Sequence, residues 1–473
     1  MGRTIEELYL ERFGCESETA LPISGSGSHR RYYRLSAPAG CAIGVKGTDP
    51  DENKAFIYLA GHFRKKEINV PEILAVADGG MEYLQEDLGE TSLFDKVAEG
   101  RNSGNYGEEE TDFLCAALSE LPKIQFIGAQ DLDYSICYPD REFNARMVDF
   151  DLNYFKYCFL KLSGIEFNEI WLQNDFDRLK NDLLEDFGKT FMYRDFQARN
   201  IMWHKDSPWF IDFQGGRRGP IFYDAVSFIW QAGSHFPKEM KARLEDCYMT
   251  ALKRFATIKE SIFRSRMHIF ALFRVMQVLG AYGFRGRFER KAHFLSSIPF
   301  AIDNLGQLLE EPLKKYPYLE KVLRELIIRE SGEPRDETEG LEVEVMSFSY
   351  RKGVPEDRSI HGGGYVFDCR ALNNPGRYDR FKGLSGLDPE VAEFLVGNSD
   401  TEAFLNEIYA PVDRHVRVFL GRGFKHLRIC FGCTGGRHRS VYCAEKMAEH
   451  IHSAFGVRVS LHHRELGIKR TLE

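Results

Sequence analysis

Short apolar and alternating segments in the first ninety residues give way to helical periodicity further along the chain. The early pattern predicts a small sheet with strands at 31–35, 42–45, 70–76 and 81–85 and a helix at about 51–63. Beyond residue 90, apolar residues recur three and four positions apart, as in amphipathic helices, near 112–121, 148–162, 238–255 and 262–279. A strand-rich patch around 191–214 interrupts these helices. The order predicts an α+β domain with two lobes.

A polar run that contains glycine and proline, 330–340, separates this region from the rest of the chain. We predict a first domain over 1–330, with lobes at about 1–86 and 90–330, a linker over 331–342 and a second domain over 343–473. The second domain has expected strands at 342–350, 364–369, 427–432 and 457–462 and expected helices at 389–395, 401–412 and 440–455. This alternation predicts a smaller α/β domain.

The composition agrees with two folded domains, because 473 residues exceed what one hydrophobic core supports. Hydrophobic residues at 43% and charged residues at 28% exclude extensive disorder. The sequence has no secretory signal, no apolar run approaching about 18 residues, and scattered cysteines, so we expect a cytoplasmic protein without a membrane partner. Residues 343–473 hold 19 Lys and Arg against 16 Asp and Glu, which favours an anionic ligand for the second domain.

Three polar residues in the strand-rich patch have the spacing that phosphoryl transfer needs. Tyr193-Arg-Asp-Phe-Gln-Ala-Arg-Asn200 is followed eleven residues later by Ile211-Asp-Phe-Gln214. The reaction requires a carboxylate near the acceptor hydroxyl, and an amide and a second carboxylate to hold magnesium. We assign the first role to Asp195 and the metal to Asn200 and Asp212. The alternative is that these residues cap a helix or lie exposed on loops.

Upstream residues supply candidates for nucleotide binding. The glycine- and serine-rich turn Gly25, Ser26, Gly27 and Ser28 would cover phosphates with backbone N–H groups. Lys46, at the end of an apolar strand, would reach the α- and β-phosphates, with Glu52 on the next helix as its nearest ion-pair candidate; a surface role for Lys46 is the alternative. By resemblance to kinases, Glu86 to Leu88 would form a hinge whose backbone binds adenine, so Glu86 and Leu88 complete the predicted nucleotide site.

These motifs resemble the aminoglycoside phosphotransferase and choline kinase superfamily, whose catalytic loop reads HxDxxxxN. Tyr193 replaces the histidine, and Gln214 stands where protein kinases have glycine. The resemblance implies a protein-kinase-like bilobal domain that uses ATP and Mg²⁺. It is closest to kinases of N-acetylmuramate and N-acetylglucosamine, from which Lys46 departs, and it implies an amino-sugar acceptor near Asp195. Choline, aminoglycoside and homoserine-like acceptors are the alternatives.

In the second domain, an apolar strand runs into a glycine-rich turn and a helix at Ile429-Cys-Phe-Gly-Cys-Thr-Gly-Gly-Arg-His-Arg-Ser-Val441. Backbone N–H groups at this helix start, together with Arg439 and Ser440, would make a phosphate cradle. The same residues satisfy Cys-x5-Arg-Ser, so Cys433 is also a candidate phosphatase nucleophile. Gly432 stands where such phosphatases usually have histidine.

Six ordered blocks between about 345 and 465, among them Ser347-Phe-Ser-Tyr-Arg-Lys-Gly353 and the glycine-rich turn, resemble the C-terminal domain of the RNase adapter RapZ. That domain binds glucosamine-6-phosphate and small RNAs. The resemblance implies a phosphosugar site, here a hexosamine phosphate site, made of Asp368, Arg370, Cys433, Thr434, Gly435, Gly436, His438 and Arg439. Gly376 replaces the family's histidine, and a lysine-rich tail shrinks to Lys469 and Arg470. Because RNA binding needs several phosphate contacts, we favour phosphosugar sensing over RNA binding. A degenerate kinase lobe on an RNA- or phosphosugar-binding regulator, and reuse of the fold without ligand, are alternatives.

Overall fold

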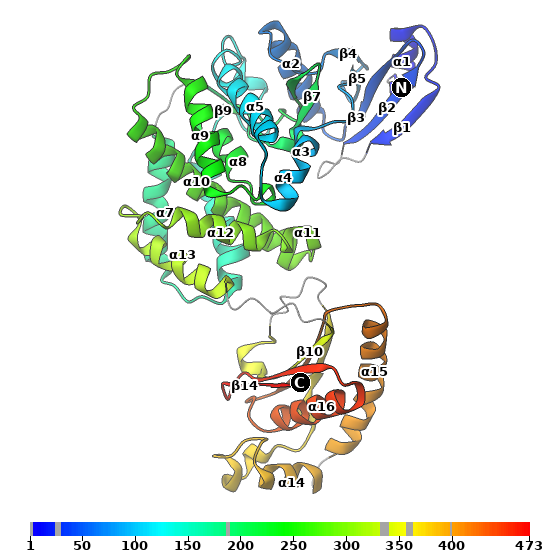
Figure 1. Cartoon of the computed structure of the whole chain (residues 1–473), viewed down its shortest axis with the longest axis vertical. Helices are drawn as coiled ribbons and strands as arrows, with labels where there is room; N and C mark the ends of the chain where they lie inside the picture. The colour runs from blue at the N-terminus through cyan, green and yellow to red at the C-terminus, as the bar shows by residue number, and fades with distance from the viewer. Residues whose placement is uncertain (1–2, 24–29, 186–189, 332–339, 356–362, 398–399) are drawn as a thin grey trace. The chain divides into compact units, whose positions relative to one another are not determined.

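A computed structural model describes residues 3–23, 30–185, 190–331, 340–355, 363–397 and 400–473 of the chain (Figure 1). The backbone divides into two compact units, Met1–Gly332 and Glu333–Glu473. The division falls inside the predicted linker, of which residues 332–339 lie outside the described ranges.

The first lobe of the first unit is an antiparallel five-stranded sheet of order β1-β2-β3-β5-β4. Its strands are β1 (Thr19–Ile23), β2 (Arg31–Ala37), β3 (Gly40–Lys46), β4 (Ile73–Val76) and β5 (Glu82–Glu86). Successive side chains of a strand point to opposite faces. Helix α1 (Ile5–Phe13) therefore packs on one face through Ile5 and Leu8, and α2 (Pro50–Lys65) packs on the other through Phe56 and Leu59.

Helix α2 begins where the sequence gives a strong start signal. Asp49 accepts hydrogen bonds from the N–H groups of Asp51 and Glu52, and Pro50 occupies the first turn. This arrangement satisfies backbone donors at the helix start, and proline costs nothing there. The cap fixes the position of Glu52, which lies in the first turn of the helix and lines the cavity described below.

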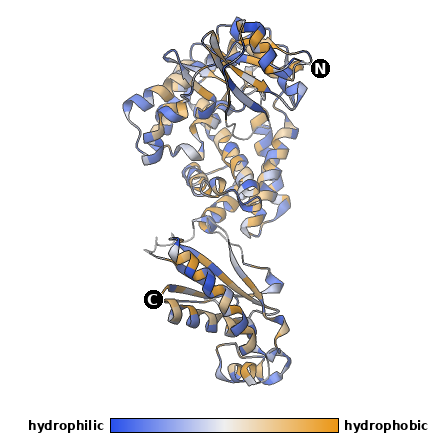
Figure 2. Cartoon of the chain, turned by 90° about the vertical axis from the view of Figure 1, so that its right-hand side faces the viewer, coloured by the Kyte–Doolittle hydropathy of each residue, from blue (hydrophilic) through white to orange (hydrophobic). Residues whose placement is uncertain are grey.

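The second lobe is mainly helical, as predicted. Its longer helices are α5 (Glu108–Phe126), α6 (Ala145–Phe155), α7 (Glu169–Leu184), α8 (Phe222–Ile229), α9 (Lys238–Leu252), α10 (Glu260–Tyr282), α12 (Ile298–Leu308) and α13 (Pro317–Glu330). The short ones are α3 (Leu93–Lys96), α4 (Ala98–Ser103) and α11 (Ala292–Leu295). Hydrophobic and hydrophilic residues mix along these helices in Figure 2, as expected for amphipathic helices around a core.

Two features of this lobe differ from the sequence expectations. Cys115 of α5 and Cys247 of α9 form a disulfide, although scattered cysteines favoured reduced thiols. The helix Glu260–Phe288 is long and apolar enough to cross a membrane, although no such run was expected. Its apolar window is 56% buried, and α10 contributes Phe263, Met267 and Phe270 to the core, so packing inside the lobe accounts for its hydrophobicity.

Four short strands of the predicted strand-rich patch and its continuation carry the polar motifs. β6 (Thr190–Met192) pairs with β9 (Arg217–Gly219), and β7 (Ile201–His204) pairs with β8 (Ser207–Phe210). Both pairs are antiparallel, so the segments 193–200 and 211–216 emerge as neighbouring loops.

The second unit is an α/β domain around a sheet of order β11-β12-β10-β13-β14. Its strands are β10 (Glu342–Ser349), β11 (Gly364–Asp368), β12 (His426–Cys433), β13 (Arg458–His463) and β14 (Ile468–Leu472). Its helices are α14 (Pro389–Gly397), α15 (Thr401–Gly421) and α16 (Arg439–Phe455). The first four strands are parallel and only the pairing of β14 is antiparallel within the described residues. The carboxyl ends of β10, β11 and β12 therefore meet at one edge, where parallel sheets usually bind ligands.

Candidate functional site

A cavity of about 1040 Å³ in the first unit brings the predicted motifs together. Glu86 and Leu88 of the predicted hinge line it, together with Asp195, Asn200 and Asp212. Three segments far apart in sequence thus face one space large enough for a nucleotide and a small acceptor. The turn Gly25–Ser28 lies outside the described residues.

Asp195, Asn200 and Asp212 are linked by hydrogen bonds. The amide Nδ2 of Asn200 donates to the backbone carbonyl of Asp195 at 2.9 Å and to Oδ2 of Asp212 at 3.3 Å. Because both donations use Nδ2, the Asn200 amide oxygen is the atom that can act as a metal ligand. Amide and carboxylate oxygens suit a hard cation such as Mg²⁺. The donor set at this position therefore fits the predicted metal.

The loop that carries Asp195 is held from beneath by Asp224, a buried residue of α8. Its carboxylate accepts hydrogen bonds from the N–H groups of Tyr193 at 2.8 Å and Arg194 at 2.7 Å. Complete burial raises the pKa of Asp224 to about 7, against the two backbone donors, which lower it. Tyr193, in the place of the usual histidine, donates its hydroxyl to the carbonyl of Ile211 and so ties the loop to the segment that carries Asp212.

Two residues next to the reacting position adopt left-handed backbone conformations, Arg194 with φ 79° and Asp212 with φ 68°. Such conformations are costly for residues other than glycine and persist where the surrounding structure fixes them. Here Asp224 and the Asn200 amide supply that support. The strain is consistent with a site built for orientation.

The carboxylate of Asp195 lies at the cavity and remains accessible to solvent. The protein around it limits its solvation, and this effect, followed by repulsion from Asp212, raises the pKa of Asp195. Arg194, Arg274 and Arg217 oppose the shift. A raised pKa makes an aspartate a better proton acceptor at neutral pH.

Lys46 is not where the sequence prediction placed it. Ile43 and Val45 of β3 point toward the core on the α2 side, so the alternation of the strand turns Lys46 toward α1. Its ammonium group lies 3.6 Å from Glu6 and 3.8 Å from Glu82. Among the described residues that line the cavity, Lys46 is absent. The assignment of Lys46 to the nucleotide phosphates is therefore wrong in this conformation.

Glu52 pairs instead with Arg30, whose side chain is 1% exposed and whose Nη2 lies 3.4 Å from Oε1 of Glu52. Arg30 directly precedes β2, and its guanidinium lies over the ring of Phe56. Sequence reasoning missed this residue. The signal was present in Arg30-Arg-Tyr-Tyr-Arg34, where arginines at even positions share a strand face.

Arg34, also missed, braces the predicted hinge. Its Nε and Nη2 donate to the Asp87 carboxylate at 2.7 and 3.2 Å, and Nη2 also donates to the carbonyl of Gly89 at 2.9 Å. This two-pronged contact fixes the segment after Glu86. The hinge geometry thus depends on a side chain from β2 as well as on its own backbone.

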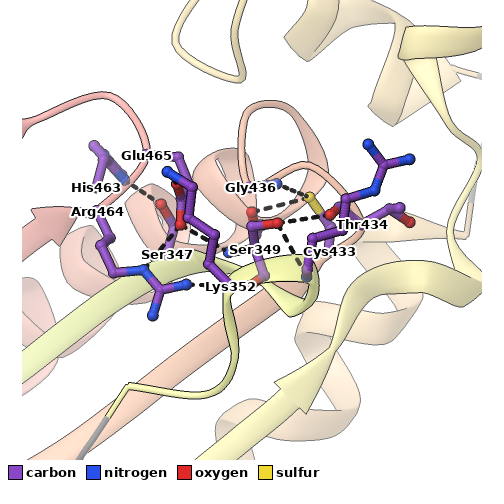
Figure 3. Close-up of polar contacts among 11 residues, drawn as sticks. Ser347, Ser349, Lys352, Cys433, Thr434, Gly436, His463, Arg464 and Glu465 are labelled. Carbon is purple, nitrogen blue, oxygen red and sulfur yellow. Dashed lines mark hydrogen bonds and ion pairs between the residues drawn. The ribbon is translucent and has the colours of Figure 1, made fainter. Parts of the chain in front are cut away.

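In the second unit, the predicted cradle lies at the carboxyl end of β12 (Figure 3). The sulfur of Cys433 accepts the N–H of Gly436 at 3.2 Å and lies 3.1 Å from the hydroxyl oxygen of Ser440. Ser349 donates its hydroxyl to the carbonyl of Thr434 at 2.7 Å, which joins the end of β10 to the turn. Gly435 follows Thr434 with open space around its Cα. Cys433, Thr434 and Gly436 of the turn therefore lie together with Ser440 at the start of α16.

The other predicted members of this site have different orientations. Arg439 is buried and donates to the carbonyls of Arg370 and Leu372, each at 2.9 Å. Its guanidinium therefore stabilises the turn after β11, whereas the prediction placed it in the cradle. His438 is hydrogen-bonded through Nε2 to the carbonyl of Phe381. Arg370 binds Asp368 at 2.6 Å, at the exposed end of β11 beside the turn, and this pairing lowers the pKa of Asp368.

The cradle is bordered by a charged cluster made of Lys352, Arg464 and Glu465. Glu465 lies 2.7 Å from Lys352 and 2.8 Å from Arg464, and Arg464 donates to the carbonyl of Ser349 at 3.1 Å. Lys352 is largely exposed. The sequence blocks that carry the resemblance include Lys352 and Arg464, but none of the three residues was predicted to belong to the site.

The two units define a class of protein: a bilobal, protein-kinase-like phosphotransferase domain joined to a smaller α/β domain. Residues 19–255 match the phosphotransferase enzyme family that includes APH, and residues 341–467 match the RapZ C-terminal domain. The chain belongs to the phosphotransferase enzyme family and carries a RapZ C-terminal domain after its kinase-like part. Both predicted resemblances are confirmed at this level.

Several known proteins are similar to parts of the chain. The chain is 31% identical over 208 residues to a nucleotide-binding protein of Fusobacterium nucleatum, covering 40% of this chain and 68% of that protein. It is 36% identical over 144 residues to a nucleotide-binding protein of Solibacter usitatus, covering 30% of this chain and less than half, 43%, of that protein. Choline kinase from Cryptosporidium parvum aligns over 65% of this chain and 93% of its own, with 11% identity and a TM-score of 0.44.

Proposed function

We propose that the first unit transfers the γ-phosphoryl group of ATP to a hydroxyl group of an amino sugar resembling N-acetylmuramate or N-acetylglucosamine. Asp195 accepts the proton of the acceptor hydroxyl, whose oxygen forms a bond to the γ-phosphorus as the bond to the β–γ bridging oxygen breaks and ADP leaves. Asn200 and Asp212 would hold Mg²⁺, which neutralises phosphate charge when it is bound.

The observation that carries this proposal is the hydrogen-bonded group of Asp195, Asn200 and Asp212 on the wall of one cavity. A helix cap would satisfy backbone donors with these side chains, whereas here the Asn200 amide joins the other two residues. The raised pKa of Asp195 supports its role as the proton acceptor. Glu86 and Leu88, on the same cavity, support adenine binding at the hinge.

The test is an ATP-consumption screen over hexosamines, muramic acid derivatives, choline and aminoglycosides with the purified full-length chain. We expect turnover with an amino sugar and its loss in Asp195→Asn. Turnover with choline or an aminoglycoside alone would contradict the proposed amino-sugar acceptor and support the kinase activity. No acceptor-dependent turnover, together with no nucleotide binding, would contradict the kinase proposal and favour a regulator with a degenerate lobe.

For the second unit we propose binding of a hexosamine phosphate at the turn that contains Cys433 and Gly436. The N–H groups of this turn, the start of α16 and the exposed Lys352 and Arg370 provide the donors that an anionic sugar needs. A kinase joined to such a sensor would couple phosphorylation to precursor supply in the cytoplasm. Calorimetry with glucosamine-6-phosphate tests the binding, and an RNA titration in the same buffer tests the alternative partner.

A further inference from the structure

A chain of polar contacts connects the buried Arg30 to the carboxylate of Asp212. Arg30 Nη2 lies 3.4 Å from Oε1 of Glu52, and Nε2 of Gln214 donates to that same oxygen at 3.4 Å. The other donation of Gln214 Nε2 reaches Oδ1 of Asp212 at 2.8 Å. Glu52, Gln214 and Asp212 line the cavity, while Arg30 lies behind them.

We propose that Arg30, Glu52 and Gln214 form a relay that positions Asp212 for the metal, in place of an ion pair that would begin at Lys46. The inference rests on the proposed phosphoryl transfer and assigns these residues a positioning role. It also gives a function to Gln214, which stands where protein kinases have glycine. A glycine there could not donate to the carboxylate of Glu52 or of Asp212.

The two oxygens of Asp212 are oriented from opposite sides. Gln214 donates to Oδ1 and Asn200 donates to Oδ2, so the plane of the carboxylate is fixed by two amides. Glu52 in turn holds the Gln214 amide, and its own orientation depends on the positive charge of Arg30. Groups that hold a metal ligand in this way usually affect metal affinity strongly.

Apolar packing reinforces the same connection. The rings of Phe56 on α2 and Phe213 beside Asp212 stack with centroids 4.8 Å apart and an angle of 10°. The guanidinium of Arg30 lies over the Phe56 ring, 5.7 Å from its centre. The start of β2, helix α2 and the metal-ligand loop therefore form one packed group, and a shift of α2 would be transmitted to Asp212.

The test measures binding of Mn²⁺ in the presence of AMP-PNP by electron paramagnetic resonance on the full chain. We expect Gln214→Ala and Glu52→Ala to weaken Mn²⁺ binding by about 10- to 100-fold. Arg30→Met should do the same, and Arg30→Lys should recover part of the loss because it restores a cation. The matched control is Arg31→Met, a neighbouring exposed arginine, for which we expect no change.

Kinetics with the acceptor found in the screen separates positioning from general damage. The Mg²⁺ concentration that gives half-maximal rate should rise in the relay variants, while the KM for the acceptor at saturating Mg²⁺ stays within about twofold. Unchanged Mn²⁺ and Mg²⁺ constants in folded Gln214→Ala and Glu52→Ala would overturn the relay and leave the kinase proposal intact. If the unsubstituted chain bound neither nucleotide nor metal, the kinase proposal itself would be contradicted.

Discussion

Substitution of Gly436 by alanine should disrupt the cradle of the second unit. Gly436 has φ +68°, in the left-handed region, and an added Cβ would lie 2.4 Å from Cγ of Glu465 and 2.8 Å from the backbone nitrogen of Ser349. The conformation costs an L-residue about 1–2 kcal/mol. The overlap costs roughly 1–3 kcal/mol more, because a backbone atom of β10 cannot move aside as a side chain can.

The expected loss is therefore about 2–5 kcal/mol of the free energy of unfolding of the second unit, against a typical total of about 5–15 kcal/mol for a domain. Gly435→Ala is the matched control, because an added Cβ there meets nothing within 4 Å. Its cost should stay within about 0.5 kcal/mol. The two adjacent glycines thus separate backbone constraint from the general effect of an added methyl group.

The assay is urea unfolding of the full chain followed by two signals. All four tryptophans, Trp171, Trp203, Trp209 and Trp230, lie in the first unit, so their fluorescence reports that unit alone. Hydrogen exchange at β10 and β12 reports the second unit. Gly436→Ala should shift the exchange-detected transition and leave the tryptophan transition in place. Equal stability of the two alanine variants would refute the described conformation of the turn.

Three further changes test the first unit. Asp195→Asn should lower kcat by about 10²- to 10⁴-fold, and the acidic limb of the wild-type pH–rate profile should lie above the usual aspartate pKa, as measured by steady-state kinetics; a limb at the ordinary value would contradict the assigned environment. Tyr193→Phe should cost about 1 kcal/mol in urea unfolding, because it removes the hydroxyl donated to Ile211, and a neutral result would show that this contact adds no stability. Asp224→Asn tests the pKa of Asp224, which burial raises to about 7. Between about pH 4 and pH 7 the folded wild type therefore binds more protons than the unfolded chain. Its free energy of unfolding should fall relative to that of the variant as pH rises through this range. Tryptophan-detected unfolding at pH 5 and pH 8 checks the sign, which would reverse if the carboxylate were stabilised by folding.

Much of this arrangement could be predicted because the motifs impose local rules. An apolar strand precedes Asp195 and another precedes Asp212, so each side chain stands on a loop that directly follows a strand, and the Asn200 amide reaches both loops. The end of β12 could be located for the same reason, since a glycine-rich turn between a strand and a helix has few conformations. Weakly patterned elements were missed, such as the exposed edge strand β1 and the short β14.

The errors arose where a side chain's direction decides its role. Ile43 and Val45 alternate along β3 and face the core, which places Lys46 on the opposite face of the strand. The prediction from the motif ignored this alternation and placed Lys46 on the face of the nucleotide site. Glu52 was predicted to pair with Lys46, but it pairs with Arg30, and no spacing rule connects Arg30 to α2. The disulfide between Cys115 and Cys247 could not be predicted, because 132 residues separate the two cysteines.

The Cys-x5-Arg-Ser pattern shows how geometry distinguishes a binding turn from a nucleophilic one. A cysteine-dependent phosphatase needs the arginine guanidinium on the phosphate, but Arg439 already donates to the carbonyls of Arg370 and Leu372 and would have to break both bonds to turn inward. The histidine that usually precedes the cysteine cannot be accommodated either, because a Cβ on Gly432 would lie 2.5 Å from the rings of Phe348 and Tyr350. What the turn retains is a group of backbone N–H groups at the start of α16, of which that of Gly436 is donated to the Cys433 sulfur, and such a group suits reversible anion binding. The same six-residue spacing therefore supports a sensor better than a hydrolase.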